Sequence, residues 1–136
     1  MTQDEKASTA KTKTRVLIVD DSSLVRLYYR QALEKAGFEI EQALNGIEGM
    51  EKVLTQRFDL AIVDINMPRM DGFSFVRALR RSAAEVATLP TLIITTEGSA
   101  QDIEDARAAG ANLYLVKPVS EPVLTRTVSV LTRVRT

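Results

Sequence analysis

Two patterns of hydrophobic residues take turns along this chain: short strand-like runs, and longer segments with helical spacing. Four short runs are apolar almost throughout, which is typical of strands buried on both faces of a sheet. A fifth segment, residues 38–41, alternates apolar and charged residues and predicts a half-exposed edge strand. The four apolar runs lie at residues 16–19, 60–63, 91–95 and 112–116.

Segments with helical spacing separate the strands, because apolar residues recur there every three or four positions. Ser22, Asn45 and Ser99 can each cap the start of a helix, and Gly37 and Gly110 can end one. The predicted helices lie at residues 22–36, 45–56, 73–82, 99–110 and 122–131. Five strands that alternate with five helices predict an α/β fold: a doubly wound, five-stranded parallel sheet with helices on both faces.

Residues 1–14 differ from the rest of the chain because they contain almost no bulky apolar residue. Such a segment cannot bury enough surface to order itself, so we expect a disordered N-terminal tail. The remaining residues, 15–136, suit a single domain of ordinary size.

The composition narrows the classes of function. Positive and negative side chains balance, with 18 of each, so no basic field indicates a nucleic-acid or acidic-lipid partner. Cysteine and histidine are absent, which excludes disulfides and histidine catalysis and disfavours zinc. No apolar run is long enough to span a membrane and the N-terminus lacks a signal-peptide core, so a cytoplasmic location is the default expectation.

Three arginines lie close together in the third predicted helix: Arg77, Arg80 and Arg81. We expect them to form a solvated helix face. A nucleic-acid site is disfavoured because acidic residues balance the basic ones.

Polar side chains follow the buried strands at the points where the strands end. They are Asp20, Asp21, Asp64, Thr95 and Lys117. Because the carboxyl ends of parallel strands meet at one edge of a sheet, we expect these residues to converge. Carboxylates brought together repel one another, and a divalent cation removes that conflict. Oxygen ligands without histidine or cysteine favour Mg²⁺, beside which a carboxylate could accept a phosphoryl group.

Four motifs in this order resemble the receiver domains of two-component response regulators, of the CheY-like single-domain type. They are residues 19–21 (Val-Asp-Asp), 64–72 (Asp-Ile-Asn-Met-Pro-Arg-Met-Asp-Gly), 95–97 (Thr-Thr-Glu) and 114–118 (Tyr-Leu-Val-Lys-Pro). Each motif alone is weak, but each lies at a predicted strand end. The resemblance covers roughly residues 15 to 134 and implies the flavodoxin-like strand order 2-1-3-4-5.

The resemblance implies the chemistry of the site. Asp64 would be the phosphoacceptor. Mg²⁺ would bind Asp20 or, more directly, Asp21, together with the Asp64 carboxylate and the backbone carbonyl of Asn66. Lys117 would pair with Asp64 or with the phosphoryl group.

The resemblance also implies a switch. The Thr95 hydroxyl would move toward the phosphoryl oxygens, and Tyr114 would change rotamer with it. Asn66 and Glu97 would flank the phosphoryl group and influence how fast it hydrolyses. The bond between Lys117 and its neighbour Pro118 is expected to be cis.

By resemblance, the chain would be a stand-alone signalling module and not an enzyme, catalysing only its own phosphorylation and dephosphorylation. A histidine kinase or a histidine phosphotransfer protein would supply the phosphoryl group. An output protein such as a flagellar motor switch component would bind the phosphorylated form, as expected for chemotaxis signalling, and a phosphatase could remove the group. No nucleic acid or membrane partner is expected.

Three other functions stay open. A phosphorelay intermediate or phosphate sink would have the same domain. A haloacid-dehalogenase-like phosphatase also uses an Asp nucleophile and Mg²⁺, but it needs a second acid two residues later, where this chain has Ser22 after Asp20 and Asn66 after Asp64. A degenerate receiver that serves only as a scaffold is disfavoured by the intact acidic, threonine and lysine set.

Overall fold

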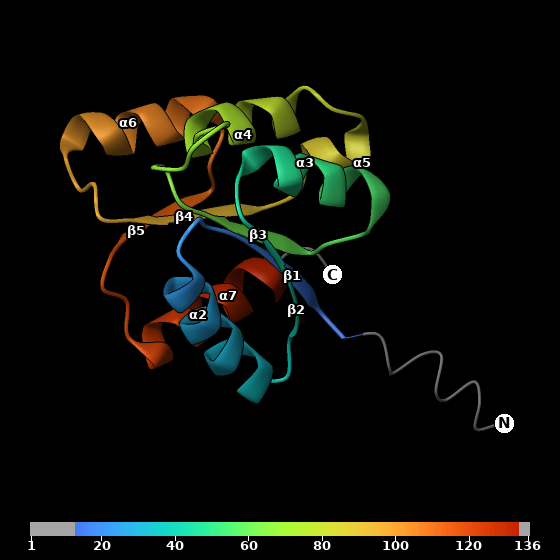
Figure 1. Cartoon of the computed structure of the whole chain (residues 1–136), viewed down its shortest axis with the longest axis vertical. Coiled ribbons are helices and arrows are strands. Elements are labelled where there is room, and N and C mark those ends of the chain that lie inside the picture. Colours follow the sequence, from blue (N-terminus) through green and yellow to red (C-terminus); the bar gives the residue numbers. More distant parts are fainter. Residues whose placement is uncertain (1–12, 134–136) are drawn as a thin grey trace, which may run out of the picture.

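The core of the protein is a five-stranded parallel sheet (Figure 1). The computed structural model describes residues 13–133, so residues 1–12 of the predicted tail lie outside the described residues. The strands are β1 (Arg15–Val19), β2 (Glu39–Ala43), β3 (Leu60–Val63), β4 (Thr91–Thr95) and β5 (Leu113–Val116). Their order in the sheet is β2-β1-β3-β4-β5, which confirms the predicted fold class and strand order.

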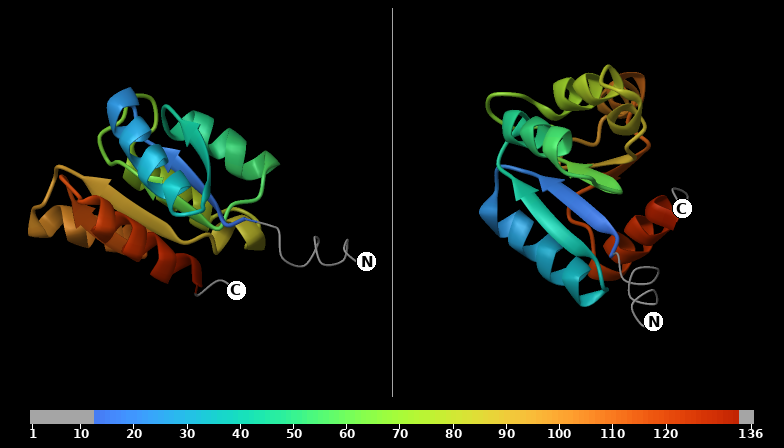
Figure 2. Two further views of the ribbon diagram at one scale, coloured as in Figure 1. Left: turned by 90° about the horizontal axis from the view of Figure 1, so that it is seen from below. Right: turned by 90° about the vertical axis from the view of Figure 1, so that its right-hand side faces the viewer.

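Helices cover both faces of this sheet (Figure 2). They are α2 (Ser23–Lys35), α3 (Gly46–Thr55), α4 (Gly72–Arg80), α5 (Ala84–Ala87), α6 (Ala100–Ala109) and α7 (Glu121–Arg133). Helices α2 and α7 lie on one face, and α3, α4 and α6 lie on the other. Five of these helices match the predicted ones. The single turn α5 is an addition, and it has no side-chain cap and no buried residue that would have marked it in the sequence.

The hydrophobic core has two halves, one on each face of the sheet. Strand β1 supplies both, because successive side chains of a strand point to opposite faces. Val16 and Ile18 pack with α2 and α7, whereas Leu17 and Val19 pack with α3 and α4. All four side chains are fully buried. The continuous apolar run therefore reflects burial on both faces, as expected for the centre of a parallel sheet.

Side-chain caps fix where the helices start and hence where the strand ends are held. The hydroxyl of Ser22 accepts a hydrogen bond from the N–H of Val25, and Ser99 accepts one from Asp102. Gly110 ends α6 with a φ of 111°, a left-handed conformation that favours glycine. These caps confirm the boundaries predicted from the sequence.

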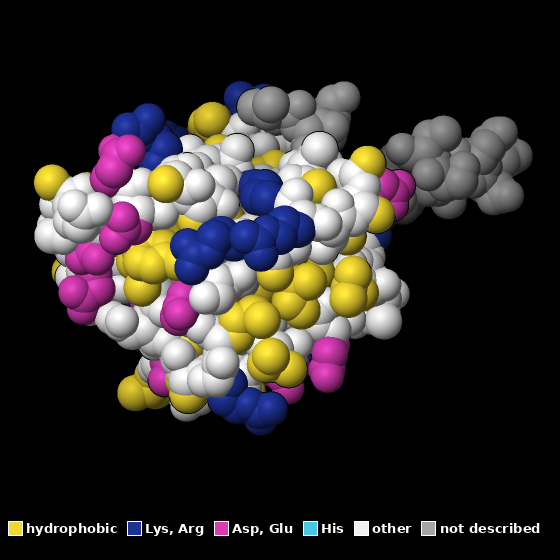
Figure 3. Space-filling model, turned by 90° about the horizontal axis from the view of Figure 1, so that it is seen from above, with side chains coloured by type: hydrophobic (Ala, Val, Ile, Leu, Met, Phe, Trp, Pro, Cys, Tyr) yellow, Lys and Arg dark blue, Asp and Glu magenta, His cyan; other side chains and the backbone are white. Residues whose placement is uncertain are grey.

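The prediction that three arginines form a solvated face is wrong for Arg80. Basic side chains do lie in a row across the helical face drawn at the top of Figure 1 (Figure 3), and Arg77 and Arg81 are exposed. Arg80 instead turns inward. Its guanidinium donates hydrogen bonds to the carbonyl oxygens of Ala87, Leu89 and Gly110, at distances of 2.7–3.0 Å. The last carbonyls of a helix have no hydrogen-bond donor within the helix and need one from elsewhere. The Arg80 side chain supplies donors to such carbonyls at the ends of both α5 and α6.

We predict that Arg80→Ala lowers the free energy of unfolding by about 2–3 kcal/mol, because several carbonyl oxygens lose a charged donor. Arg81→Ala is the matched control, since Arg81 is the exposed neighbour and should change stability by less than about 0.5 kcal/mol. Denaturant unfolding measures both. Equal effects of the two substitutions would contradict the assigned role of Arg80.

Candidate functional site

Three carboxylates gather at the carboxyl edge of the sheet. Asp20 and Asp21 follow β1, and Asp64 follows the adjacent strand β3. One oxygen from each side chain can be chosen so that all three lie within 4.8 Å of one another. Asp20 and Asp64 are only 2% and 8% exposed, whereas Asp21 faces solvent. The cluster therefore combines two buried acids with one that water can reach.

The strand ladder continues past the strand ends and sets these positions. The N–H of Asp64 donates to the carbonyl of Val19, and the N–H of Lys117 donates to the carbonyl of Thr95. Residues that follow different strands are thereby held at the same level of the sheet. The convergence predicted from the sequence follows from this register.

Every polar group of Asp20 has a partner. Its N–H donates to the carbonyl of Ala43, and its Oδ1 accepts from the N–H of Ser22 at 2.9 Å. Its Oδ2 accepts from Lys117 Nζ at 3.1 Å. Its carbonyl oxygen accepts from Arg26 Nη1 at 2.7 Å. Asp20 is therefore the fixed member of the cluster.

Lys117 bridges the two buried acids. Its Nζ lies 3.1 Å from Asp20 Oδ2 and 3.7 Å from Asp64 Oδ2. The peptide bond between Lys117 and Pro118 is cis, as predicted. One ammonium cannot balance three carboxylates, so the cluster keeps a net negative charge.

Burial raises the pKa of Asp64, and the nearby charge of Asp20 raises it further. The ammonium of Lys117 and a hydrogen bond from the Thr95 side chain act in the opposite direction and lower this pKa. With one ammonium beside three carboxylates, the cluster is short of positive charge. Its ligands are all oxygens, which suits Mg²⁺, and the side chains present fit such an ion.

The other residues predicted for the site form a hydrogen-bonded group that reaches Asp64 through the Thr95 side chain. Thr95 is fully buried at the end of β4, and its hydroxyl accepts a weak hydrogen bond from the N–H of Glu97 at 3.4 Å. The hydroxyl of the half-buried Tyr114 donates to the carbonyl of Glu97. Asn66 Nδ2 donates to Glu97 Oε2 at 3.0 Å. All residues predicted for the site therefore come together, while the role of the Asn66 carbonyl as a metal ligand stays a prediction.

Glycine at position 72 lets the chain turn tightly behind Asp64. A Cβ at Gly72 would lie 2.4 Å from the carbonyl oxygen of Asp64, a distance that no side chain can tolerate. The N–H of Gly72 donates to the carbonyl of Ile65 at 3.0 Å, which closes the loop between β3 and α4. The motif of residues 64–72 therefore also holds the backbone of the acid in place.

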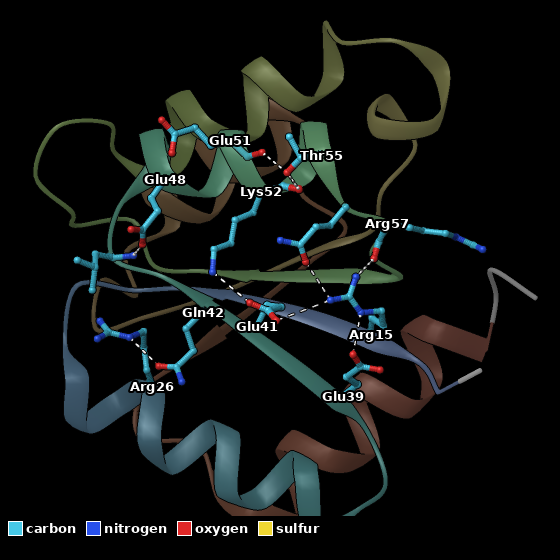
Figure 4. A network of polar contacts seen from close by, with 12 residues as sticks. Arg15, Arg26, Glu39, Glu41, Gln42, Glu48, Glu51, Lys52, Thr55 and Arg57 are labelled. Carbon is cyan, nitrogen blue, oxygen red and sulfur yellow. Dashed lines mark hydrogen bonds and ion pairs between the residues drawn. The ribbon is translucent and has the colours of Figure 1, made fainter. Parts of the chain in front are cut away.

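Sequence reasoning missed Arg26, which lies on α2 and is only 9% exposed. Besides the carbonyl of Asp20, it contacts Gln42 Oε1 on β2 through Nε at 2.9 Å (Figure 4). A signal was present: Arg26 lies between Val25 and Tyr29 in the stripe that predicts the buried face of the helix. A charged residue at such a position indicates a specific partner.

Among residues 13–133, no helix has the length and apolar character needed to cross a membrane.

The sequence matches the response regulator receiver domain family over residues 16–129. It is 36% identical over 120 residues to the sensor protein EvgS of Escherichia coli K12 and 38% identical over 108 residues to a gliding motility regulatory protein of Myxococcus xanthus. These matches cover 88% and 79% of this chain. They cover only 10% and 14% of the two relatives, so the chain corresponds to a small part of each.

Solved structures of similar length share the fold. The chemotaxis protein CheY4 of Vibrio cholerae has a TM-score of 0.84 and 38% identity, over 88% of this chain and 99% of that one. A CheY-like receiver domain protein from Methanospirillum hungatei has a TM-score of 0.85 and 27% identity, over 91% of this chain and 97% of that one. The sheet order, the acidic cluster with its lysine and the match over most of the sequence agree: this chain belongs to the response regulator receiver domain family.

Proposed function

We propose that this protein is a response regulator that accepts a phosphoryl group on Asp64 in the presence of Mg²⁺. The observation that carries the proposal is the ammonium of Lys117, placed 3.1 Å from Asp20 and 3.7 Å from Asp64 within the acidic cluster. This arrangement supplies a carboxylate nucleophile together with positive charge for the incoming oxygens. As a receiver domain, the chain is a signalling module and not a conventional enzyme.

In the proposed reaction, one Oδ of Asp64 attacks the phosphorus of the donor. An O–P bond forms while the bond from phosphorus to the leaving group breaks, and the leaving group takes the electron pair. Lys117 offsets the charge of the phosphoryl oxygens, and the Thr95 hydroxyl donates to one of them. Mg²⁺, when bound, supplies further charge neutralisation to these oxygens. The proposed metal ligands are Asp20, Asp21, Asp64 and the backbone carbonyl of Asn66.

The consequence we propose is a change at the surface formed by α6, β5 and α7. A phosphoryl group adds a charge of about −1.5 to −2 and three strong acceptors. Thr95 and Lys117 then turn toward these acceptors. As Thr95 moves inward, the Tyr114 ring fills the space and leaves the Glu97 carbonyl to which it now donates. A local change in charge thereby shifts a two-state equilibrium of the surface.

A histidine kinase or histidine phosphotransfer protein is the proposed donor, in line with the family and with the sensor protein EvgS among the relatives. An output of the chemotaxis type, such as a flagellar motor switch component, is supported by the similarity to CheY4 over nearly its full length. A phosphatase partner and a cytoplasmic location also belong to this proposal. Neither nucleic acid nor membrane has a role in it.

A phosphorelay or phosphate-sink role is the second candidate. The observation that favours it is the match to a segment of EvgS, because that relative is a sensor protein and not an output regulator. Direct binding of the phosphorylated protein to a flagellar motor switch protein would separate the two candidates.

We predict that incubation with Mg²⁺ and a small-molecule phosphodonor adds one phosphoryl group to the protein, and that Asp64→Asn abolishes this addition because the nucleophile is lost. Intact-mass spectrometry measures both. Omission of Mg²⁺ should suppress the reaction in the parent protein. A parent that stays unmodified with abundant metal and donor, or a variant modified as fully as the parent, would refute the assignment.

We predict that Asp64→Asn stabilises the metal-free protein at pH 7. The pKa of Asp64 is raised in the folded state, so the folded protein holds this proton more tightly than the unfolded chain does. Its contribution to stability is therefore greatest below the unfolded pKa, near 4, and is lost as the pH rises through the folded pKa. Thermal unfolding in EDTA should show a gain for the variant at pH 7 that shrinks toward pH 4.

Glu51→Gln is the control for loss of a negative charge, because it removes an exposed one from α3. It should change the free energy of unfolding little at pH 7 and at pH 4. Mg²⁺ at ten times its dissociation constant should then stabilise the parent by about 1.4 kcal/mol, and Asp64→Asn by less. A variant that is less stable than the parent in EDTA would contradict the electrostatic reasoning.

A further inference from the structure

Arg26 is a buried charge whose two acceptors are both neutral. Its side chain lies beneath the turn from β1 to α2 and is only 9% exposed. Nη1 donates to the main-chain carbonyl of Asp20 at 2.7 Å. Nε donates to the side-chain amide oxygen of Gln42 at 2.9 Å (Figure 4). Because burying a guanidinium is costly, a position that keeps one needs a physical reason.

The bond to the Asp20 carbonyl acts on more than Asp20. This carbonyl belongs to the peptide unit that joins Asp20 to Asp21, and a peptide unit is planar. A donor that fixes the carbonyl therefore fixes the plane and the direction in which the chain continues to Asp21. Asp21 is the exposed acid of the cluster.

We propose that Arg26 is a positioning residue for the metal site: it orients the Asp20–Asp21 peptide so that both carboxylates face one cation. This inference rests on the proposed function, in which the cluster binds Mg²⁺. The guanidinium also places a positive charge beside an acidic cluster that has one lysine for three carboxylates. Partners of metal ligands typically change metal affinity by about 10- to 100-fold when they are removed.

Strand β2 takes part in this arrangement from the edge of the sheet. The carbonyl of Ala43 accepts the N–H of Asp20, and Gln42 holds Arg26, which in turn holds the carbonyl of Asp20. The N–H of Asp20 is thus bonded directly to Ala43, and its carbonyl is linked through the Arg26 side chain to the adjacent residue Gln42. Removal of the Gln42 amide should loosen Arg26 while leaving its bond to Asp20 able to form.

The test is Mg²⁺ binding, measured by isothermal titration calorimetry on the unphosphorylated protein. Arg26→Met keeps the length and apolar stem of the side chain but removes its donors, and we expect the dissociation constant to rise by about 10-fold. Arg30→Met is the matched control on α2, because Arg30 is exposed and pairs with Glu34 at 3.0 Å. Its Mg²⁺ affinity should equal that of the parent.

Thermal unfolding in EDTA accompanies each titration, so that lost stability is separated from lost affinity. A folded Arg26→Met variant with the parent's Mg²⁺ affinity would overturn the proposal. If Arg26→Met does not fold, Gln42→Met provides the test. We expect its Mg²⁺ affinity to fall by about threefold, and an unchanged affinity would overturn the proposal. A parent that binds no Mg²⁺ overturns the proposed function itself, which keeps the two failures distinct.

Discussion

Two like charges buried at one edge of a sheet constrain the whole site. Asp20 and Asp64 are almost fully enclosed, and a single ammonium from Lys117 lies between them. Unbalanced charge in such surroundings costs several kcal/mol per ion, and the cost falls when a cation completes the cluster. Burial, followed by the charge of Asp20, raises the pKa of Asp64 in the metal-free protein. In the function that we propose, this carboxylate binds the metal and reacts with an electrophilic phosphorus.

The parallel sheet supplies this constraint because it brings residues far apart in the sequence to one level. Lys117 lies 97 residues from Asp20 and still contacts it, since the ladder from β1 to β5 ends at a common edge. Tight turns behind the strands hold the acids there. Gly72 permits the turn behind Asp64, where a Cβ would lie 2.4 Å from the Asp64 carbonyl oxygen. No single helix or strand carries the whole site, so the site exists only in the folded chain.

Sequence patterns predicted the sheet, the five long helices and the convergence of polar residues at the strand ends, because each carries a local signal: an apolar run, a cap or a polar residue after a strand. Asn66, Glu97 and Tyr114 were added by the family resemblance, and the roles of the site residues stay predictions. The partners of Arg80 and Arg26 escaped prediction because both side chains donate to main-chain carbonyls. Every residue carries such a carbonyl, so the sequence does not mark which one accepts. Helix α5 was missed because one turn without a cap has no periodicity to detect.

The most direct test of the account is a pH titration of the Asp64 carboxyl carbon by ¹³C NMR, first in EDTA and then with excess Mg²⁺. Without metal, we predict a pKa above the ordinary aspartate value, caused by burial and by the charge of Asp20. We predict that this pKa falls when Mg²⁺ is added, because the cation favours the charged carboxylate. An ordinary pKa in EDTA that Mg²⁺ leaves unchanged would contradict the claim that charge repulsion in this cluster prepares Asp64 for metal and phosphate.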